Sequence, residues 1–209
     1  MDHKQHWDAI YRSRTPQELS WFQSRPEVSL DLIAAAGIGK EEAIVDVGGG
    51  ASTLVDHLLA AGFTRPSVLD ISPAALEQAR RRLGSRAHQV EWFEADVAGF
   101  NPPHRFKLWH DRAVFHFLTS PSERQAYSEA LQRALTPGGF AILATFALDG
   151  PEQCSGLPVM RYDSAGISAA LGGGFSLRDS RREVHRTPQG ALQSFNYFLL
   201  ALAAPKVRS

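Results

Sequence analysis

Two kinds of hydrophobic pattern alternate along residues 43–171. Short runs rich in β-branched and other apolar residues, such as 43–47 and 67–71, are typical of buried strands. Between them lie stretches whose apolar residues recur at helical spacing, for example Leu54, Leu58 and Leu59. Strands that alternate regularly with amphipathic helices favour a parallel sheet wrapped by helices on its faces. The pattern therefore predicts an α/β fold.

The same periodicities predict the individual elements. Strands are expected at residues 43–47, 67–71, 89–93, 106–111 and 140–148, and helices at 28–36, 52–61, 74–83, 120–135 and 164–171. Ser72 followed by Pro73 is typical of a helix start, and residues 136–139, Thr-Pro-Gly-Gly, are expected to form a turn that ends a helix. Two longer β stretches, 175–185 and 191–202, flank a turn at 187–190 and predict an antiparallel hairpin that closes the sheet.

The residues before 43 have a different character. Trp7, Tyr11, Trp21 and Phe22 lie in a polar segment interrupted by proline. Such a segment is too short to enclose a core of its own. We expect residues 1–26 to form a lid over the sheet edge and residues 27–204 to form the α/β core, within a single domain that spans 1–209.

Composition and charge exclude several classes of protein. The 209 residues are 44% hydrophobic and contain 22 basic and 22 acidic side chains, so the formal net charge is zero. This balance is typical of a globular protein and gives no electrostatic case for a nucleic-acid or anionic-membrane partner. The one cysteine, Cys154, permits no internal disulfide and no thiolate zinc site. The first residues lack the apolar run of a signal peptide, and we expect a cytoplasmic protein.

Three acidic residues come at the expected carboxyl ends of consecutive strands. Asp46, Asp70 and Asp96 are separated by 24 and 26 residues, about one strand–helix unit each. In a doubly wound sheet this edge is where ligands bind. The glycines at 48, 49 and 50 let the backbone approach a ligand, and the next helix start offers free N–H groups. We expect Asp70 to accept from ribose hydroxyls and Asp96 from an adenine amino group, in a site for a nucleoside with a small zwitterion.

A nicotinamide dinucleotide is the main alternative ligand for such a loop. Its fingerprint requires Gly-x-Gly-x-x-Gly, whose last glycine permits close packing of helix on strand. Gly48 and Gly50 match that pattern, but Thr53 occupies the third position. The loop therefore favours the nucleoside with a zwitterion over the dinucleotide.

Four ordered motifs resemble those of the class I S-adenosylmethionine (SAM)-dependent methyltransferases. They are residues 44–52, with Ser52 in place of the last glycine, and residues 68–72, 94–97 and 135–139. The resemblance covers about residues 40–150, and the usual Phe-Asp opening of the fourth strand is replaced by Phe106-Lys107. It implies a Rossmann-like, doubly wound, seven-stranded and mostly parallel sheet with an antiparallel last strand. It also implies SAM as the cofactor, bound by Asp46, Gly48, Gly49, Gly50, Asp70, Ile71, Asp96 and Val97.

Methyl transfer from a sulfonium is an in-line displacement, so the protein has to align the acceptor and exclude water. A base is required only when the acceptor must lose a proton. In the resembling family the stretch after the fourth strand borders the methyl group, and here it contains His110, Asp111, Arg112 and His116. Either histidine is a candidate base, and Arg112 is expected to hold a carboxylate or to pair with Asp111. No metal site is expected from the two histidines, which lack a third ligand nearby.

Several functions remain compatible with these residues. The leading hypothesis is a methyltransferase that acts on a small molecule. The N-terminal aromatic pattern is similar to that of the citrate synthase and elongation factor 1A lysine methyltransferases, which suggests a protein substrate instead. A SAM-binding module without catalysis and a transferase that uses a SAM derivative are also compatible with the motifs.

Overall fold

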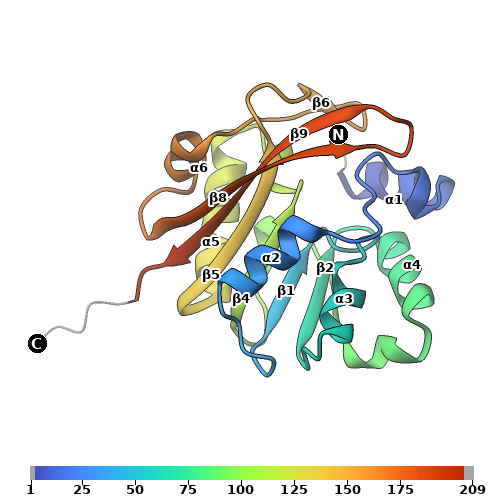
Figure 1. The fold of residues 1–209 in the computed structure, drawn as a ribbon, viewed down its shortest axis with the longest axis horizontal. Coiled ribbons are helices and arrows are strands. Elements are labelled where there is room, and N and C mark those ends of the chain that lie inside the picture. Colours follow the sequence, from blue (N-terminus) through green and yellow to red (C-terminus); the bar gives the residue numbers. More distant parts are fainter. Residues whose placement is uncertain (1–2, 205–209) are drawn as a thin grey trace, which may run out of the picture.

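Seven strands form one twisted sheet at the centre of the protein (Figure 1), which we describe from a computed structural model covering residues 3–204. The order across the sheet is β3-β2-β1-β4-β5-β9-β8. The strands are β1 (Ile44–Val47), β2 (Pro66–Asp70), β3 (Glu91–Glu94), β4 (Phe106–Arg112), β5 (Leu135–Phe146), β8 (Phe175–Arg186) and β9 (Leu192–Leu202).

Strand directions agree with the predicted fold class. Strands β1 to β5 pair in parallel, whereas β9 is antiparallel both to β5 and to β8. The chain winds outward from β1 to β3, then returns to place β4 on the other side of β1. The prediction of a doubly wound, seven-stranded sheet with an antiparallel hairpin is confirmed. The strand order reverses between β1 and β4, which is where ligands bind in such sheets.

Six α-helices flank the sheet (Figure 1) in the described part of the chain. They are α1 (His3–Ser13), α2 (Glu27–Ala35), α3 (Leu54–Ala60), α4 (Pro73–Leu83), α5 (Pro121–Ala134) and α6 (Ser164–Leu171). Helices α5 and α6 pack on the face that presents Val45, Trp109 and Leu143, and α2 and α3 pack on the face that presents Ile44 and Leu108. Both faces are thus buried, as a parallel sheet requires.

Side-chain caps fix where the helices begin. Ser72 accepts a hydrogen bond from the backbone N–H of Ala75, so it is the N-cap of α4, as the sequence predicts. Ser120 and Glu123 form a reciprocal capping box at the start of α5. These caps set the ends of the loops that follow β2 and β4, and both loops border the cavity described below.

Three segments differ from the expectations. Residues 3–13 form helix α1 rather than an irregular segment, because Tyr11 is buried and Asp8 accepts hydrogen bonds from Ser72 Oγ and Ala74 N at the start of α4. The expected turn at 136–139 is part of β5, which begins at Leu135 opposite Phe106 and continues through a register shift. The loop after β5 contains a small hairpin of β6 (Gln153–Cys154) and β7 (Leu157–Pro158).

The N-terminal segment lies over the carboxyl ends of the strands, beside α4 (Figure 1). The 3-10 helix η1 (Pro16–Glu18) follows α1 and leads into residues 19–26, which we call the covering segment. Helix α1 is held against α4 by Gln78 Nε2, which donates to the carbonyl of Tyr11 at 2.6 Å. No helix within residues 3–204 combines the length and the hydropathy needed to cross a membrane. The expected domain ends, residues 1 and 209, lie outside the described residues.

Candidate active site

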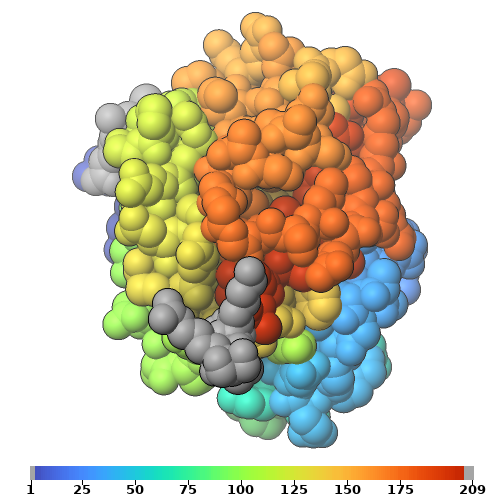
Figure 2. All heavy atoms as spheres, turned by 90° about the vertical axis from the view of Figure 1, so that its left-hand side faces the viewer, coloured from blue at the N-terminus to red at the C-terminus, as the bar shows by residue number. Residues whose placement is uncertain are grey.

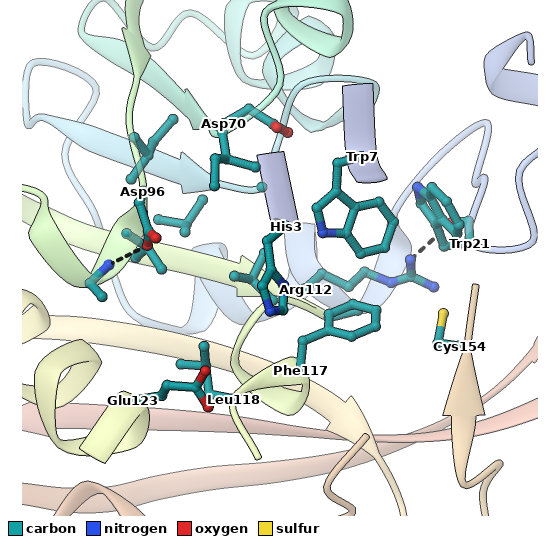
Figure 3. Close-up of a pocket in the computed structure, with 18 of the residues that line it drawn as sticks. His3, Trp7, Trp21, Asp70, Asp96, Arg112, Phe117, Leu118, Glu123 and Cys154 are labelled. Atoms are coloured by element: carbon teal, nitrogen blue, oxygen red, sulfur yellow. Dashed lines mark hydrogen bonds between the residues drawn. The ribbon is translucent and has the colours of Figure 1, made fainter. Parts of the chain in front are cut away.

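The principal cavity lies at the carboxyl ends of β1, β2 and β4, beneath α1 (Figure 3). It encloses about 1130 Å³, part of which is open to solvent. Its lining includes six of the residues predicted from the sequence: Gly48, Asp70, Ile71, Asp96, Val97 and Arg112. Residues from four different segments therefore converge on one hollow at the point where the strand order reverses.

The glycine loop after β1 is packed too closely to tolerate side chains. Gly48 has a φ of +65°, and its N–H donates to the carbonyl of Leu69 at 2.7 Å. A Cβ at this position would stand 2.2 Å from Val114 Cγ2, and one at Gly49 would stand 2.4 Å from Asp46 Oδ2. Gly48 alone of these glycines lines the cavity, so the other two serve the tight turn.

Asp70 is held by the same loop. Its carboxylate accepts hydrogen bonds from the backbone N–H of Gly50 at 3.0 Å and of Ser72 at 2.8 Å. The side chain borders the cavity although the residue is only 5% exposed. Burial raises the pKa of Asp70 to about 6, because the two backbone donors offset only part of the lost hydration. The carboxyl group thus changes charge close to neutral pH.

Asp96 faces the cavity from the neighbouring strand end. It follows β3 and caps the 3-10 helix η3 (Val97–Gly99), where its side chain accepts from the N–H of Ala98 at 2.9 Å. Figure 3 shows Asp96 and Asp70 on the same side of the cavity, away from Trp21 and Cys154. Asp96 is exposed, so its second carboxylate oxygen is accessible to a ligand.

Asp46 borders a second, smaller cavity of about 520 Å³ on the other side of the glycine loop. Its Oδ1 lies 2.7 Å from His110 Nδ1, and His110 Nε2 lies 2.9 Å from Ser29 Oγ. Its Oδ2 is buried and has no hydrogen-bond partner among the described residues. The two cavities share Val47, Gly48, Trp21 and Arg112 as lining residues. His110 therefore supports Asp46 rather than facing the principal cavity.

Asp111 is a structural residue in this arrangement. Its carboxylate accepts from the N–H groups of Val114 at 2.8 Å and Phe115 at 3.1 Å and from the hydroxyl of Tyr127 at 2.5 Å. It does not line the principal cavity, and burial raises its pKa to about 6. These bonds fix the start of the 3-10 helix η4 (Phe115–Phe117), which leads back to the cavity.

His116 is enclosed among aromatic side chains. Its ring lies 4.4 Å from that of Phe117 and 4.9 Å from that of Phe146, measured between centroids. Neither ring nitrogen has a hydrogen-bond partner in residues 3–204, and the residue is fully buried. Burial lowers the pKa of His116 to about 3, because the imidazolium would have no hydration. A neutral ring outside the cavity is poorly placed to act as a base.

Arg112 does not pair with Asp111, which was one of the two roles expected for it, and its expected binding of a carboxylate stays a prediction. Its Nε donates to Tyr197 Oη and its Nη1 to the carbonyl of Trp21, both at 2.9 Å. The acidic side chain nearest to it is Glu183 on β8, with 3.9 Å between Nη2 and Oε2, rather than Asp111. Arg112 is the one member of the predicted catalytic group that lines the principal cavity.

Aromatic residues complete the cavity wall. Trp7, Tyr11 and Trp21 of the N-terminal segment line it, and Phe22 lines the smaller cavity. The sequence reasoning missed further lining residues, among them His3, Phe117, Leu118, Glu123, Gln193 and Phe195. Gln193 and Phe195 come from β9, and no local sequence signal marks them, because the register of the hairpin brings them to the site.

Part of the chain is similar to known proteins in sequence. Residues 44–139 match the family model of the methyltransferase domain. Nodulation protein S from Rhizobium tropici is 30% identical over 101 residues, which are 48% of this chain and 42% of that protein. The alignment thus spans less than half of that curated relative. The resemblance to class I SAM-dependent methyltransferases predicted from the motifs is confirmed.

Two solved structures share the fold across nearly the whole chain. An enzyme described by the conversion of a disulfide bond into a thioacetal group during echinomycin biosynthesis has a TM-score of 0.79 and 19% identity, covering 97% of this chain and 94% of that one. The N-methyltransferase NodS from Bradyrhizobium japonicum, in complex with S-adenosylhomocysteine (SAH), has a TM-score of 0.70 and 15% identity, covering 93% and 97%. At these identities the likeness establishes the fold.

Proposed function

We propose that this chain, which carries a methyltransferase domain of the class I SAM-dependent type, transfers a methyl group from SAM to a small molecule. The observation that carries the proposal is the convergence of Asp70, Asp96 and Gly48 on one cavity at the reversal of strand order. Two carboxylates beside a loop without side chains suit a nucleoside whose hydroxyl and amino groups need hydrogen-bond acceptors. The NodS structure holds SAH, a ligand of this chemical class.

The residues present fit the whole cofactor. Asp70 would accept from the ribose hydroxyls, Asp96 from the adenine amino group, and Ile71 and Val97 would contact the base. The buried Asp46 Oδ2, which has no partner in the described chain, would receive the ammonium group of the amino-acid tail in the smaller cavity. Side chains at Gly48 and Gly49 would clash with Val114 and Asp46. Without them Gly48 borders both cavities, which suits a slender tail that reaches from one to the other.

For this reaction the protein mainly has to align the acceptor with the methyl group of SAM. SAM supplies an activated methyl group on a positively charged sulfur. The protein contributes by holding both reactants in line under a cover of aromatic side chains that excludes water. The lid contributes to this cover, since Trp7 packs against Trp21 with 5.9 Å and against Phe117 with 5.0 Å between ring centroids.

A small acceptor suits this cover better than a lysine on a folded protein. The lid helix α1 is tied to the body by Asp8 at the start of α4 and by the ion pair between Lys4 and Glu94, 2.6 Å apart. His185 Nε2 and Ser20 O, 2.8 Å apart, tie the next part of the segment to the hairpin. A substrate that fits beneath a fixed lid is enclosed, as is typical of small-molecule sites.

Two measurements test the proposal in sequence. Isothermal titration should show that the protein binds SAM and SAH, and failure to bind either below millimolar concentration would remove the proposed function. Transfer of labelled methyl groups from SAM in a lysate, followed by separation of proteins from small molecules, should place the label in the small-molecule fraction. Label in the protein fraction would support the protein-lysine alternative, and intact binding without label in either fraction would support a non-catalytic module.

A further inference from the structure

The cavity extends beyond the glycine loop to a compartment that the cofactor residues do not line. We call it the acceptor end, and its walls are Trp21, Arg112, Phe117, Phe146, Cys154 and Phe195. Figure 3 shows Trp21, Arg112, Phe117 and Cys154 grouped together, on the side opposite Asp96. These residues come from β4, η4, β5, β9 and the β6–β7 hairpin, and Trp21 comes from the covering segment.

Aromatic rings give this compartment an apolar wall. The rings of Phe146 and Phe195 pack edge to face with 4.8 Å between centroids, and Cys154 and Phe117 pack in the same hydrophobic cluster. Burial raises the pKa of the Cys154 thiol, so this group is neutral as well. Walls of this kind favour a flat, apolar ligand body.

Arg112 is the exception in this wall. Its guanidinium carbon lies 4.7 Å from the centroid of the Phe195 ring, and the bonds to Tyr197 and Trp21 use two of the five N–H donors. Nη2 is buried and donates no hydrogen bond to any described residue. The nearest carboxylate, Glu183, is 3.9 Å away and already accepts from Tyr197 Oη and Gln23 Nε2, each at 2.6 Å.

A buried guanidinium nitrogen that donates no hydrogen bond is costly, and an anionic oxygen is the group that satisfies it best. The charge of Arg112 also acts on its surroundings, since it contributes to lowering the pKa values of His116 and His185. The acceptor end therefore carries one cationic side chain in an otherwise apolar wall, with Glu183 as its nearest counter-charge. That combination favours an anion and disfavours a protonated amine.

None of the base candidates predicted from the sequence lines the acceptor end. Asp111 and His116 lie outside the cavity lining, and His110 lies in the smaller cavity. His3 and Glu123 do line the principal cavity, so groups that accept a proton are present there, but an acceptor that arrives with an available electron pair needs no base. In the displacement, that pair forms the new bond to the methyl carbon while the carbon–sulfur bond breaks, and its electrons return to sulfur as a neutral thioether.

We infer, on the basis of the proposed function, that the methyl acceptor is a flat apolar molecule with a carboxylate or another anionic oxygen, and that Arg112 Nη2 binds this oxygen. Arg112 is then a specificity-determining residue. The carboxylate of the cofactor has the same chemistry and could reach Arg112 through the smaller cavity, so the test separates these two sources.

The test compares a flat carboxylate with its neutral amide. Isothermal titration with 2-naphthoate and 2-naphthamide is run on the protein alone and on the protein saturated with SAH. The expected dissociation constant for 2-naphthoate is at least tenfold lower than for 2-naphthamide. In Arg112→Gln this ratio should fall to about one, while the dissociation constant for SAH should change less than threefold.

Arg182→Gln is the matched control. Arg182 lies on the edge strand β8, pairs with Asp149 at the surface and does not line the cavity. This variant should retain the preference for 2-naphthoate. Equal binding of the two probes by the unaltered protein would overturn the inference, as would a preference that survives Arg112→Gln. A tenfold loss of SAH affinity in Arg112→Gln with the preference intact would assign Arg112 to the cofactor. If the protein does not bind SAH, the proposed function is wrong. The ratio of dissociation constants for the two probes then still decides whether Arg112 binds an anionic oxygen.

Two further measurements cover the case in which Arg112→Gln does not fold. Arg112→Lys keeps the charge but loses the planar fork of donors, so its ratio should lie between those of the unaltered protein and of the glutamine variant. Cys154 is the only cysteine and lines the acceptor end, so 2-naphthoate should slow its alkylation by iodoacetamide, measured by mass spectrometry, more than 2-naphthamide does. Equal protection by the two probes would contradict the inference without any substitution.

Discussion

His110 Nδ1 lies 2.7 Å from Asp46 Oδ1 across the two central strands, where the two residues are direct register partners of β1 and β4. Both side chains are almost completely buried. With the carboxylate as acceptor, Nδ1 donates to Asp46, and Nε2 forms a hydrogen bond of 2.9 Å with the Ser29 hydroxyl. The strand pairing thus orients the carboxylate whose other oxygen, Oδ2, faces the glycine loop.

Removing His110 should destabilise the protein more than replacing it with another donor. His110→Ala leaves the buried Asp46 without a donor, which should lower the free energy of unfolding by about 3–5 kcal/mol. His110→Asn retains a side-chain N–H near the position of Nδ1 and should cost at least ~1 kcal/mol less. Urea unfolding followed by circular dichroism measures both. Equal losses in the two variants would indicate that His110 contributes by packing alone.

Gly48→Ala should disrupt cofactor binding, with Gly62→Ala as its control. Both glycines have positive φ, +65° and +84°, so both alanines incur a backbone cost of about 1–2 kcal/mol. The added Cβ would stand 2.2 Å from Val114 Cγ2 at position 48 but would meet nothing within 4 Å at position 62. We expect Gly48→Ala to weaken SAH binding at least tenfold in isothermal titration, and Gly62→Ala to leave it unchanged. Similar affinities for the two variants would show that the loop adjusts to the side chain.

The cofactor side of the site could be predicted because its signals are local. Asp70 ends strand β2 and Asp96 comes two residues after β3, and parallel strands bring their carboxyl ends to one edge of the sheet. Ser72 likewise caps α4 through residues next to it in sequence. Each of these positions depends on a few neighbouring residues and on the fold class.

The acceptor end depends instead on contacts between distant segments. Phe195 reaches it because β9 pairs with β5 so that Phe195 lies opposite Phe146, a register that the hairpin fixes between residues far apart in the chain. Pairing with Asp111 was one of the two roles expected for Arg112, but strand geometry points successive side chains to opposite faces, and Arg112 meets Glu183 instead. Tertiary packing decides both positions, and no short pattern encodes it. Helix α1 was missed although Trp7, Ile10 and Tyr11 recur at helical spacing, and contacts such as that of Asp8 with Ser72 stabilise it.

His116→Phe should preserve SAH binding and increase resistance to acid. The pKa of the buried ring is lowered from 6.5 to about 3, so the folded state resists a proton that the unfolded chain accepts. The associated stability is fully present above pH 6.5 and is lost as the pH falls toward 3, by up to about 1.4 kcal/mol per pH unit. The variant has no such ring to protonate. Between pH 6.5 and 4 its free energy of unfolding should therefore fall less than that of the unaltered protein. A pH-independent difference, or a variant that loses methyl transfer while keeping SAH affinity, would contradict the assignment of His116 to packing.

Cofactor affinity should fall in acid because of Asp70. The pKa of this carboxyl is raised to about 6 by burial, so below that pH the folded protein without ligand holds a proton on it. A protonated carboxyl cannot accept from both ribose hydroxyls while it also accepts from Gly50 and Ser72. If only the ionised form binds, the dissociation constant for SAH at pH 5 should be about tenfold higher than at pH 7. Isothermal titration across this range measures it, with Asp70→Asn as the comparison: its binding should be weaker and independent of pH. A slope that persists in Asp70→Asn would assign the titration to another group, with Asp111 the first to test because its pKa is also about 6.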